Sequence, residues 1–334
     1  MKAIMLIKAG GVENLVLSDI PKPTIQNSKQ LLVKLHAAGF NPVDYKLRGR
    51  GGFKPEKLPI ILGCDGVGIV EAIGDEVSRF KVGDEVYFWH GGLGLDNQGN
   101  YAEYTVIHED YAAEKPQQFS MQEAAALPLA WVTAWESLVD RVHLKSGETV
   151  LIHAAAGGVG HLAVQLAKNL GAIVIATVSG EEKTNYVKSL GAEHCIDYRK
   201  EDFVEATLKL TDGKGVDVVF DTVGGETFCK SFSATKIYGR VVTLLEHPCN
   251  ADTIKVAKQR NLSLAFELML TPAIFNMHDA RINQRKMLEQ ANEWIKENRL
   301  KIRIDQTFSF EEIAQAHQAL ETGRTFGKMV LKIV

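Results

Sequence analysis

The run from Glu148 to Lys168 constrains the fold more strongly than any other part of this chain. An apolar strand leads into a glycine turn, and the turn leads into a helix whose leucines recur at helical spacing. In such a turn Gly157 lets the backbone approach a pyrophosphate and Gly160 lets the helix pack closely on the strand, while Ala155 takes the place of a first glycine. The helix N-terminus then offers unpaired N–H groups and a positive dipole end to the phosphates. The run predicts a dinucleotide-binding unit, and a tight turn that binds nothing is the alternative.

A second strand, 173–178, follows the helix at the distance that a parallel βαβ unit requires. At its end, where an acidic residue would accept the ribose hydroxyls of NADH, the chain has Ser179. Lys183 and Arg199 offer charge-assisted donors to a 2′-phosphate, and Tyr198 offers a ring that can stack on adenine. We therefore predict NADPH as the cofactor. Ordinary solvated surface charges at the two basic positions are the alternative.

The chain of 334 residues is long enough for two domains. Its first third alternates short β-rich segments with Gly and Pro turns, which predicts a mostly antiparallel, partly barrel-like sheet with strands at 3–8, 30–38, 66–73, 84–88 and 102–107. Helices then alternate with strands, and the first helix follows the capping-box pair Ser120 and Glu123. This alternation predicts an α/β doubly wound parallel sheet with strands at Val150, Ile173, Cys195, 216–221 and 239–245.

The end of the chain departs from this alternation. A helix is predicted at 281–298, a second helix after the capping-box pair Ser309 and Glu312, and a final strand at 329–334. Because these elements are too few to form a domain, we expect the tail to return to the first domain. The predicted boundaries are 1–121 for the N-terminal part of the catalytic domain, 122–268 for the NADP(H)-binding domain and 269–334 for the return to the catalytic domain.

Composition and charge argue against several classes of protein. Hydrophobic residues make up 46% and charged residues 24%, and no apolar run approaches the ~20 residues of a membrane span. The chain also shows no signal-peptide pattern, so the expected location is cytoplasmic. A formal net charge of −3 without a Lys/Arg-rich block argues against nucleic acid as a partner. The four cysteines, Cys64, Cys195, Cys229 and Cys249, are far apart and form no C-x-x-C pair, so we expect reduced thiols and no local zinc site.

Several motifs occur in a fixed order along the chain: Gly39-Phe-Asn-Pro-Val-Asp44, Gly63-Cys-Asp-Gly-Val-Gly68, Val82-Gly-Asp-Glu-Val86, Gly99-Asn-Tyr-Ala-Glu-Tyr104, Ala124-Ala-Ala-Leu-Pro128 and the glycine turn. Through them the chain resembles, over nearly its whole length, the zinc-free quinone oxidoreductase (zeta-crystallin-like) branch of the medium-chain dehydrogenase/reductase superfamily. The resemblance implies a GroES-like catalytic domain split around a Rossmann domain. It also implies a homodimer built through the Rossmann part.

The same resemblance bears on metal binding. At the places that align with the catalytic zinc ligands of alcohol dehydrogenases in this superfamily, the chain has Asn41, Cys64 and Leu129. One thiol cannot supply the three protein ligands of a catalytic zinc site. The short segment 91–99 stands where zinc enzymes carry a four-cysteine lobe. We therefore expect no metal.

The resemblance implies hydride transfer from the nicotinamide to a quinone or to the β-carbon of an enone or enal, with negative charge developing on the acceptor oxygen. Asn41, Tyr45 and Thr133 are the candidates that stabilise this charge or orient the nicotinamide, and Asp44 belongs to the same loop as Asn41. A turn-forming Asn-Pro pair is the alternative for Asn41, and a helical threonine bonded to its own backbone is the alternative for Thr133. Some family members carry the tyrosine one place later, where this chain has Lys46.

Ligands of doubly wound sheets lie at the carboxyl ends of the strands, which extends the list of predicted cofactor contacts. The predicted contacts are Ala155, Gly157, Gly158, Val159, Gly160, Ser179, Lys183, Tyr198, Arg199, Thr222, Val223, Leu244, Leu245 and Glu246. The family resemblance implies further contacts from Thr133 and from the returning loop of Phe326, Gly327 and Lys328. His153 is expected to pack under the turn, and His161 is expected at the surface.

These features predict an NADPH-dependent, zinc-independent reductase of quinones or α,β-unsaturated carbonyl compounds. A zinc-free alcohol dehydrogenase or an enoyl-thioester reductase on the same scaffold is the first alternative. A thioester reductase should need a basic groove for the coenzyme phosphates, and the catalytic third offers no clear Lys/Arg cluster. A non-catalytic NADPH-binding protein is the second alternative.

Overall fold

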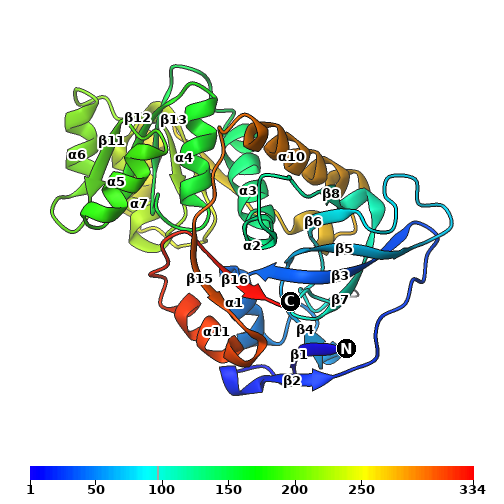
Figure 1. Cartoon of the computed structure of the whole chain (residues 1–334). Helices are drawn as coiled ribbons and strands as arrows, with labels where there is room; N and C mark the ends of the chain where they lie inside the picture. Colours follow the sequence, from blue (N-terminus) through cyan, green and yellow to red (C-terminus); the bar gives the residue numbers. More distant parts are fainter. Residues whose placement is uncertain (96–97) are drawn as a thin grey trace. The chain divides into compact units, whose positions relative to one another are not determined.

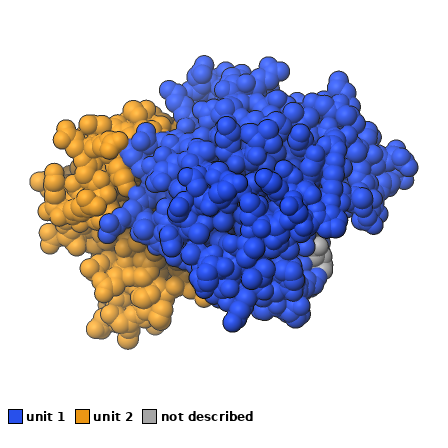
Figure 2. Space-filling model, turned by 60° about the horizontal axis from the view of Figure 1, so that its bottom comes forward, with its two compact units in different colours: residues 1–130, 270–334 blue, residues 131–269 orange. Residues whose placement is uncertain are grey.

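The computed structural model describes residues 1–95 and 98–334. Figure 1 labels the elements, and Figure 2 colours the two compact units into which the chain divides. Unit 1 comprises residues 1–130 and 270–334, and unit 2 comprises residues 131–269. One unit has a mostly antiparallel sheet and the other a parallel sheet, which confirms the predicted fold class.

Unit 1 contains two sheets. The smaller has the order β2-β1-β4, with bounds β1 (Lys2–Leu6), β2 (Leu15–Asp19) and β4 (Ile60–Ile61). The larger has the order β15-β16-β3-β5-β6-β8, with β7 also paired to β3; the bounds are β3 (Gln30–Gly39), β5 (Asp65–Ile73), β6 (Glu85–Trp89), β7 (Tyr104–His108), β8 (Ala113–Glu114), β15 (Ile304–Phe308) and β16 (Lys328–Lys332). All pairs are antiparallel except β15 with β16. Alternate residues of β3, Leu31, Val33 and Leu35, enter the core of this sheet, as the period of a strand requires.

Two helical segments of unit 1, α2 (Met121–Ala126) and the 3₁₀ turn η5 (Phe310–Glu312), begin at the predicted capping boxes. Unit 1 also contains α1 (Pro42–Arg50), α9 (Thr271–Ile274), α10 (His278–Lys296) and α11 (Ile313–Glu321), with 3₁₀ turns η1 (Val12–Asn14), η2 (Pro55–Lys57) and η3 (Glu109–Tyr111). The backbone N–H of Ser120 donates to Glu123 Oε2 at 2.8 Å, and that of Ser309 donates to Glu312 Oε2 at 2.8 Å. Both predicted capping boxes are therefore present.

The tail of the chain rejoins the N-terminal part within unit 1. Strand β16 pairs antiparallel with β3 through Val330 opposite Gly39. Helix α2, which the boundary at residue 121 assigned to the second domain, packs against β3, β5 and β16 and belongs to unit 1. The boundary between the units falls inside α3 (Pro128–Trp135).

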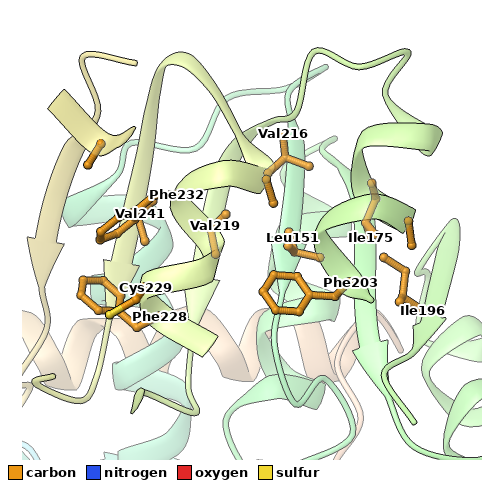
Figure 3. Packing of buried hydrophobic residues seen from close by; sticks show 13 residues of the cluster. Leu151, Ile175, Ile196, Phe203, Val216, Val219, Phe228, Cys229, Phe232 and Val241 are labelled. Carbon is orange, nitrogen blue, oxygen red and sulfur yellow. The ribbon is translucent and has the colours of Figure 1, made fainter. Parts of the chain in front are cut away.

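Unit 2 contains a six-stranded sheet in which every pair of neighbouring strands is parallel, and helices connect the strands. The order β11-β10-β9-β12-β13-β14 joins β9 (Thr149–Ile152), β10 (Ile173–Val178), β11 (His194–Asp197), β12 (Val216–Asp221), β13 (Thr235–Thr243) and β14 (Ser263–Phe266). The helices are η4, a π-helix (Glu136–Arg141), α4 (Gly160–Asn169), α5 (Glu181–Ser189), α6 (Phe203–Leu210), α7 (Gly225–Ala234) and α8 (Ala251–Gln259). Figure 3 shows Phe203 of α6 and Phe228 and Phe232 of α7 in the same hydrophobic cluster as Leu151 and Val219 of the sheet.

The expectation of four reduced cysteines was wrong. Cys229 of α7 forms a disulfide with Cys249, which lies after β13. Their Cα atoms are 5.5 Å apart, and α7 packs against α8, which begins two residues after Cys249. Cys64 and Cys195 are free. Among the described residues, no helix is long and apolar enough to cross a membrane.

Candidate active site

The predicted cofactor contacts of unit 2 follow the carboxyl ends of neighbouring strands. The glycine turn follows β9, Ser179 follows β10, Thr222 follows β12 and Leu244 follows β13. These strands are adjacent in the order β10-β9-β12-β13 and are all parallel, so the four points meet at one edge of the sheet. The structure therefore brings together residues that are far apart in the sequence.

The glycine turn is tightly held. A Cβ on Gly160 would lie 2.3 Å from the carbonyl oxygen of Ala154 and 2.8 Å from Cα of Ala155, so only glycine allows α4 to begin here. Ala154 itself has a left-handed φ of 47°, and the Ala155 N–H donates to the Thr177 carbonyl of β10 at 3.0 Å. Gly157, Gly158 and Val159 are half-buried just before the helix. At Gly160 this turn leaves no room for a side chain, which is the close strand-to-helix packing expected of a pyrophosphate-binding turn.

Two histidines lie beside this turn, and both are buried. His153 has its ring nitrogens 3.2 Å from Thr177 Oγ1 and 2.9 Å from Ser231 Oγ, and burial lowers its pKa to about 4. The sequence predicts that His153 packs under the turn, and its buried position agrees with this. The surface position predicted for His161 was wrong: it is 0% exposed, because α4 is buried on nearly all sides, and its Nδ1 lies 2.8 Å from the Gly157 carbonyl.

Asp197 is a residue that the sequence analysis missed at the end of the neighbouring strand β11. Its Oδ2 accepts a hydrogen bond from the Gly180 N–H at 3.3 Å, and its Oδ1 accepts one from the Arg199 N–H at 3.1 Å. The carboxylate therefore holds the loops that carry Ser179 and Arg199. Only its place in the sheet, opposite Val178 of β10, shows this role.

The side chains predicted to meet a 2′-phosphate belong to these loops and to α5. Lys183 lies in the first turn of α5 and is half-buried. Arg199 is exposed, and Tyr198 is 52% exposed. Ser179 is half-buried. These side chains are accessible to a ligand at the carboxyl edge of the sheet.

The loop after β12 is held by a buried carboxylate. Asp221 is 0% exposed, and its Oδ1 accepts from the Val223 N–H at 3.0 Å. The Thr243 hydroxyl at the end of β13 donates to Asp221 Oδ2 at 2.7 Å, and the Thr222 hydroxyl donates to the His153 carbonyl at 2.9 Å. Asp221 thus fixes the loop that carries the predicted contacts Thr222 and Val223, and this loop is bonded to the ends of β9 and β13. Beyond β13, Leu244 and Leu245 are half-buried and Glu246 is exposed.

Asn41 of unit 1 lies at the centre of a buried polar cluster. It precedes α1, and its backbone N–H donates to Asp44 Oδ2 at 2.7 Å. Its side-chain Nδ2 donates to Asp65 Oδ2 at 2.8 Å, and its Oδ1 accepts from Lys328 Nζ at 2.5 Å. Asn41 is only 2% exposed. Both ends of its amide are therefore engaged within the protein.

Lys328 and Asp65 carry the charge of this cluster. Lys328 is 4% exposed, and its Nζ donates to the Phe40 carbonyl at 2.9 Å and lies 3.6 Å from Asp65 Oδ2. The second oxygen of Asp65 accepts from the Leu129 N–H at 2.8 Å. The ammonium group of Lys328, predicted to meet the cofactor, is thus directed at the loop of Asn41.

Asp44 is the other carboxyl group of the cluster and is fully buried. Burial raises its pKa to about 7, while hydrogen bonds from Tyr101 OH at 2.7 Å and from the Asn41 N–H act in the opposite direction. Burial also raises the pKa of Asp65 and lowers that of Lys328. A pKa above the ordinary 3.8 means that the folded protein holds the Asp44 proton more tightly than the unfolded chain does. The stabilising contribution of Asp44 is therefore lost as the pH rises from about 4 through 7.

The remaining predicted residues have simpler surroundings. Tyr45 is half-buried on α1, and Thr133 of α3 is 5% exposed. Phe326 is 8% exposed and packs under the Arg303 guanidinium, 3.8 Å from its ring centroid. Gly327 has a left-handed φ of 95° in the turn before β16.

The side chains at the places of the zinc ligands do not fit a catalytic zinc ion. Among the described residues, no group of three or more His, Cys, Asp or Glu is arranged to hold a metal ion. The amide of Asn41 is engaged by Asp65 and Lys328, and Leu129 has no donor atom in its side chain. Burial, with the charges of Asp44 and Asp65, raises the pKa of the Cys64 thiol well above its usual value, whereas zinc binds the thiolate.

Comparison with known proteins places this geometry in a family. Residues 27–117 match the family "Alcohol dehydrogenase GroES-like domain", and residues 190–331 match the family "Zinc-binding dehydrogenase". A quinone oxidoreductase from Pseudomonas aeruginosa is 35% identical over 99% of this chain and 99% of its own length. The chain belongs to the quinone oxidoreductase branch of the medium-chain dehydrogenase/reductase superfamily. The family name that mentions zinc contrasts with the donor set of this member.

Two further comparisons concern the cofactor. The chloroplastic NADPH-dependent alkenal/one oxidoreductase of Arabidopsis thaliana is 35% identical over 99% of this chain and 79% of its own length. A crystal structure of an NAD-dependent alcohol dehydrogenase is 32% identical, with a TM-score of 0.90 and coverage of 100% of both chains. The family member described here therefore has a nicotinamide-dependent dehydrogenase fold, which the glycine turn of unit 2 fits.

Proposed function

We propose that this family member reduces quinones or α,β-unsaturated carbonyl compounds with NADPH and without a metal. Bound at the carboxyl edge of unit 2, NADPH would supply the hydride. A proton completes the two-electron reduction. The observation that carries most weight is the hydrogen-bonded cluster around Asn41, a residue that the resemblance aligns with a zinc ligand of alcohol dehydrogenases. The names of the relatives also support the proposal.

The side chains divide into two roles in this proposal. Tyr45 and Thr133 are the candidates for catalytic residues that donate to the acceptor oxygen or orient the nicotinamide. Asn41 and Asp44 act as positioning residues, because their polar atoms bond to Asp65, Lys328 and Tyr101 and fix the start of α1, which carries Tyr45. The proposed preference for NADPH rests on two basic side chains, Lys183 and Arg199, which lie near Ser179 at the carboxyl edge of the unit 2 sheet. A cytoplasmic location remains part of this proposal.

We also propose that the protein is a homodimer formed through unit 2. Strand β14 is the last strand of its sheet and exposes large apolar side chains, with Leu264 40% and Phe266 61% exposed. An apolar edge strand is a site for pairing with a second strand. Symmetry would place β14 of two copies against each other.

Phe266→Glu is therefore expected to convert a dimer into a monomer, because it places a charge in an apolar interface. Sedimentation equilibrium at one protein concentration measures the mass. Phe275→Glu is the matched control, since Phe275 is 71% exposed in unit 1 and should leave the mass unchanged. A monomeric parent, or a dimeric Phe266→Glu, would show that β14 is not the interface.

The catalytic proposal is tested by steady-state oxidation of NADPH with a panel of acceptors. Quinones and enals or enones should be reduced, and simple ketones and enoyl thioesters should be much poorer acceptors. Preferred turnover of a thioester or a ketone would favour one of the alternative enzymes. Binding of NADPH without turnover of any acceptor would favour a non-catalytic role.

A further inference from the structure

Unit 1 contains a cavity whose described lining includes none of the residues assigned above to the cofactor or to catalysis. Its volume is about 160 Å³, and an engineered protein cavity of ~150 Å³ is known to hold benzene. It is lined by apolar side chains of Leu93, Leu95, Pro272, Ala273 and Ile274, by Gly91, and by the polar side chains of Lys54, Tyr111, Asn276 and Arg281. Within the described part of this lining, two side chains are cations and none is a carboxylate.

Arg281 is the buried cation of this cavity. It is 6% exposed, and its guanidinium lies 3.8 Å from the ring centroid of Trp89 and 4.5 Å from that of Tyr111. Its Nη2 donates to the Trp89 carbonyl at 2.9 Å, and its Nε is buried without a hydrogen-bond partner in the described structure. Two ring faces and one carbonyl replace only part of the hydration that a guanidinium loses on burial.

The acid nearest in sequence to this aromatic pair is already engaged. Asp110 Oδ2 lies 3.4 Å from Nε2 of His278, and the Asp110 N–H donates to His108 Nδ1 at 3.2 Å. Tyr111 OH lies 2.8 Å from Nδ1 of His278, which holds its ring in place beside Arg281. Burial lowers the pKa of Arg281 to about 10, so the group keeps its charge at neutral pH. The cavity wall therefore presents a rigid, positively charged and incompletely solvated group.

A purely structural role for Arg281 would be to tie α10 to Trp89 of β6. That role explains why the guanidinium stacks on Trp89 and Tyr111 and why it donates to the Trp89 carbonyl. It does not explain why a cavity adjoins Arg281 or why a second cation, Lys54, lines the same cavity. A guanidinium donates to a carboxylate through two parallel N–H groups, and the apolar lining suits a hydrocarbon chain. We propose that this cavity binds a small monocarboxylate with a short apolar chain, with Arg281 as the main partner of the carboxylate and Lys54 as a second cation.

This site does not depend on the proposed reductase activity, because none of its described lining residues has a role in that proposal. Two sources would supply the same chemistry: a carboxylate that is part of the acceptor, or a separate carboxylic acid that binds beside it. A reduced acceptor affinity in saturating carboxylate, with unchanged maximal rate, identifies the first source. An unchanged acceptor affinity identifies the second.

Isothermal titration of the full-length protein with hexanoate and with hexanamide tests the site. The two probes have the same chain and differ in charge. Hexanoate should bind about ten- to a hundredfold more tightly, because a hydrogen bond to a charged group contributes that much to affinity. Raising the salt concentration should weaken hexanoate and leave hexanamide nearly unchanged.

Three variants separate the site from general destabilisation. Arg281→Met should remove the preference for hexanoate, and Arg281→Lys should restore part of it because the charge returns without the planar fork. Lys54 is half-buried, so Lys54→Met should fold normally and weaken hexanoate about three- to tenfold. Equal binding of the two probes by the parent, or no binding of either, would overturn the proposal. If Arg281→Met does not fold, an unchanged hexanoate affinity in Lys54→Met, with no salt dependence in the parent, would also overturn it.

Discussion

Replacing Lys328 with methionine is expected to lower the free energy of unfolding by about 3–5 kcal/mol, because it leaves the buried carboxylate of Asp65 without its cation. The change also removes the donor to the Asn41 amide and to the Phe40 carbonyl. Denaturant unfolding followed by circular dichroism measures the effect. Lys332→Met is the matched control on the same strand, since Lys332 is exposed and should change stability by less than about 0.5 kcal/mol.

The double variant Lys328→Met with Asp65→Asn tests the cause of this loss. Removing both charges should cost less than the sum of the two single changes, because neither charge is then left unpaired. Exact additivity would show that the two side chains do not interact. A loss below about 0.5 kcal/mol in Lys328→Met would show that the ammonium is not buried in this cluster.

Lys183→Ala is expected to weaken NADPH binding by about one to two powers of ten and to leave NADH binding nearly unchanged. The reason is that a hydrogen bond to a charged group contributes about 1.5–3 kcal/mol, and only NADPH carries the 2′-phosphate. Equilibrium dissociation constants for both cofactors, measured at one salt concentration, test this.

Lys188→Ala serves as the control for Lys183, because Lys188 is exposed near the other end of α5. It should leave both dissociation constants unchanged. A parent that prefers NADH, or an equal weakening of both cofactors by Lys183→Ala, would remove the proposed phosphate contact. Asp197 would then be the residue to examine, since its carboxylate lies at the end of β11, beside the end of β10.

The strands and helices of the core could be predicted from sequence because their patterns are local and strong. The observed bounds of β3, β5 and β12 lie within one residue of the predicted ones. Strands β2, β4 and β8 were missed, and so were β14 and β15. Strands β14 and β15 have mostly exposed or half-buried residues and lie at the ends of their sheets, so their sequences carry little hydrophobic alternation.

The same distinction holds for the candidate site. The glycine turn could be predicted because the close approach of α4 to β9 requires glycine at one position, Gly160. The bond between Lys328 and Asn41 joins residues 287 positions apart, and no local pattern predicts it. The disulfide between Cys229 and Cys249 was missed for a similar reason, since the two cysteines meet where α7 packs against the start of α8.

The central claim is metal-free hydride transfer from NADPH to a conjugated acceptor. The most direct measurement uses NADPH carrying deuterium on the transferable position of nicotinamide C4, a chelator-dialysed enzyme and an enone. Mass spectrometry and NMR should find one deuterium on the β-carbon of the reduced product, at the same rate before and after dialysis. Loss of turnover on dialysis that stoichiometric zinc restores, or a product without deuterium, would contradict the claim.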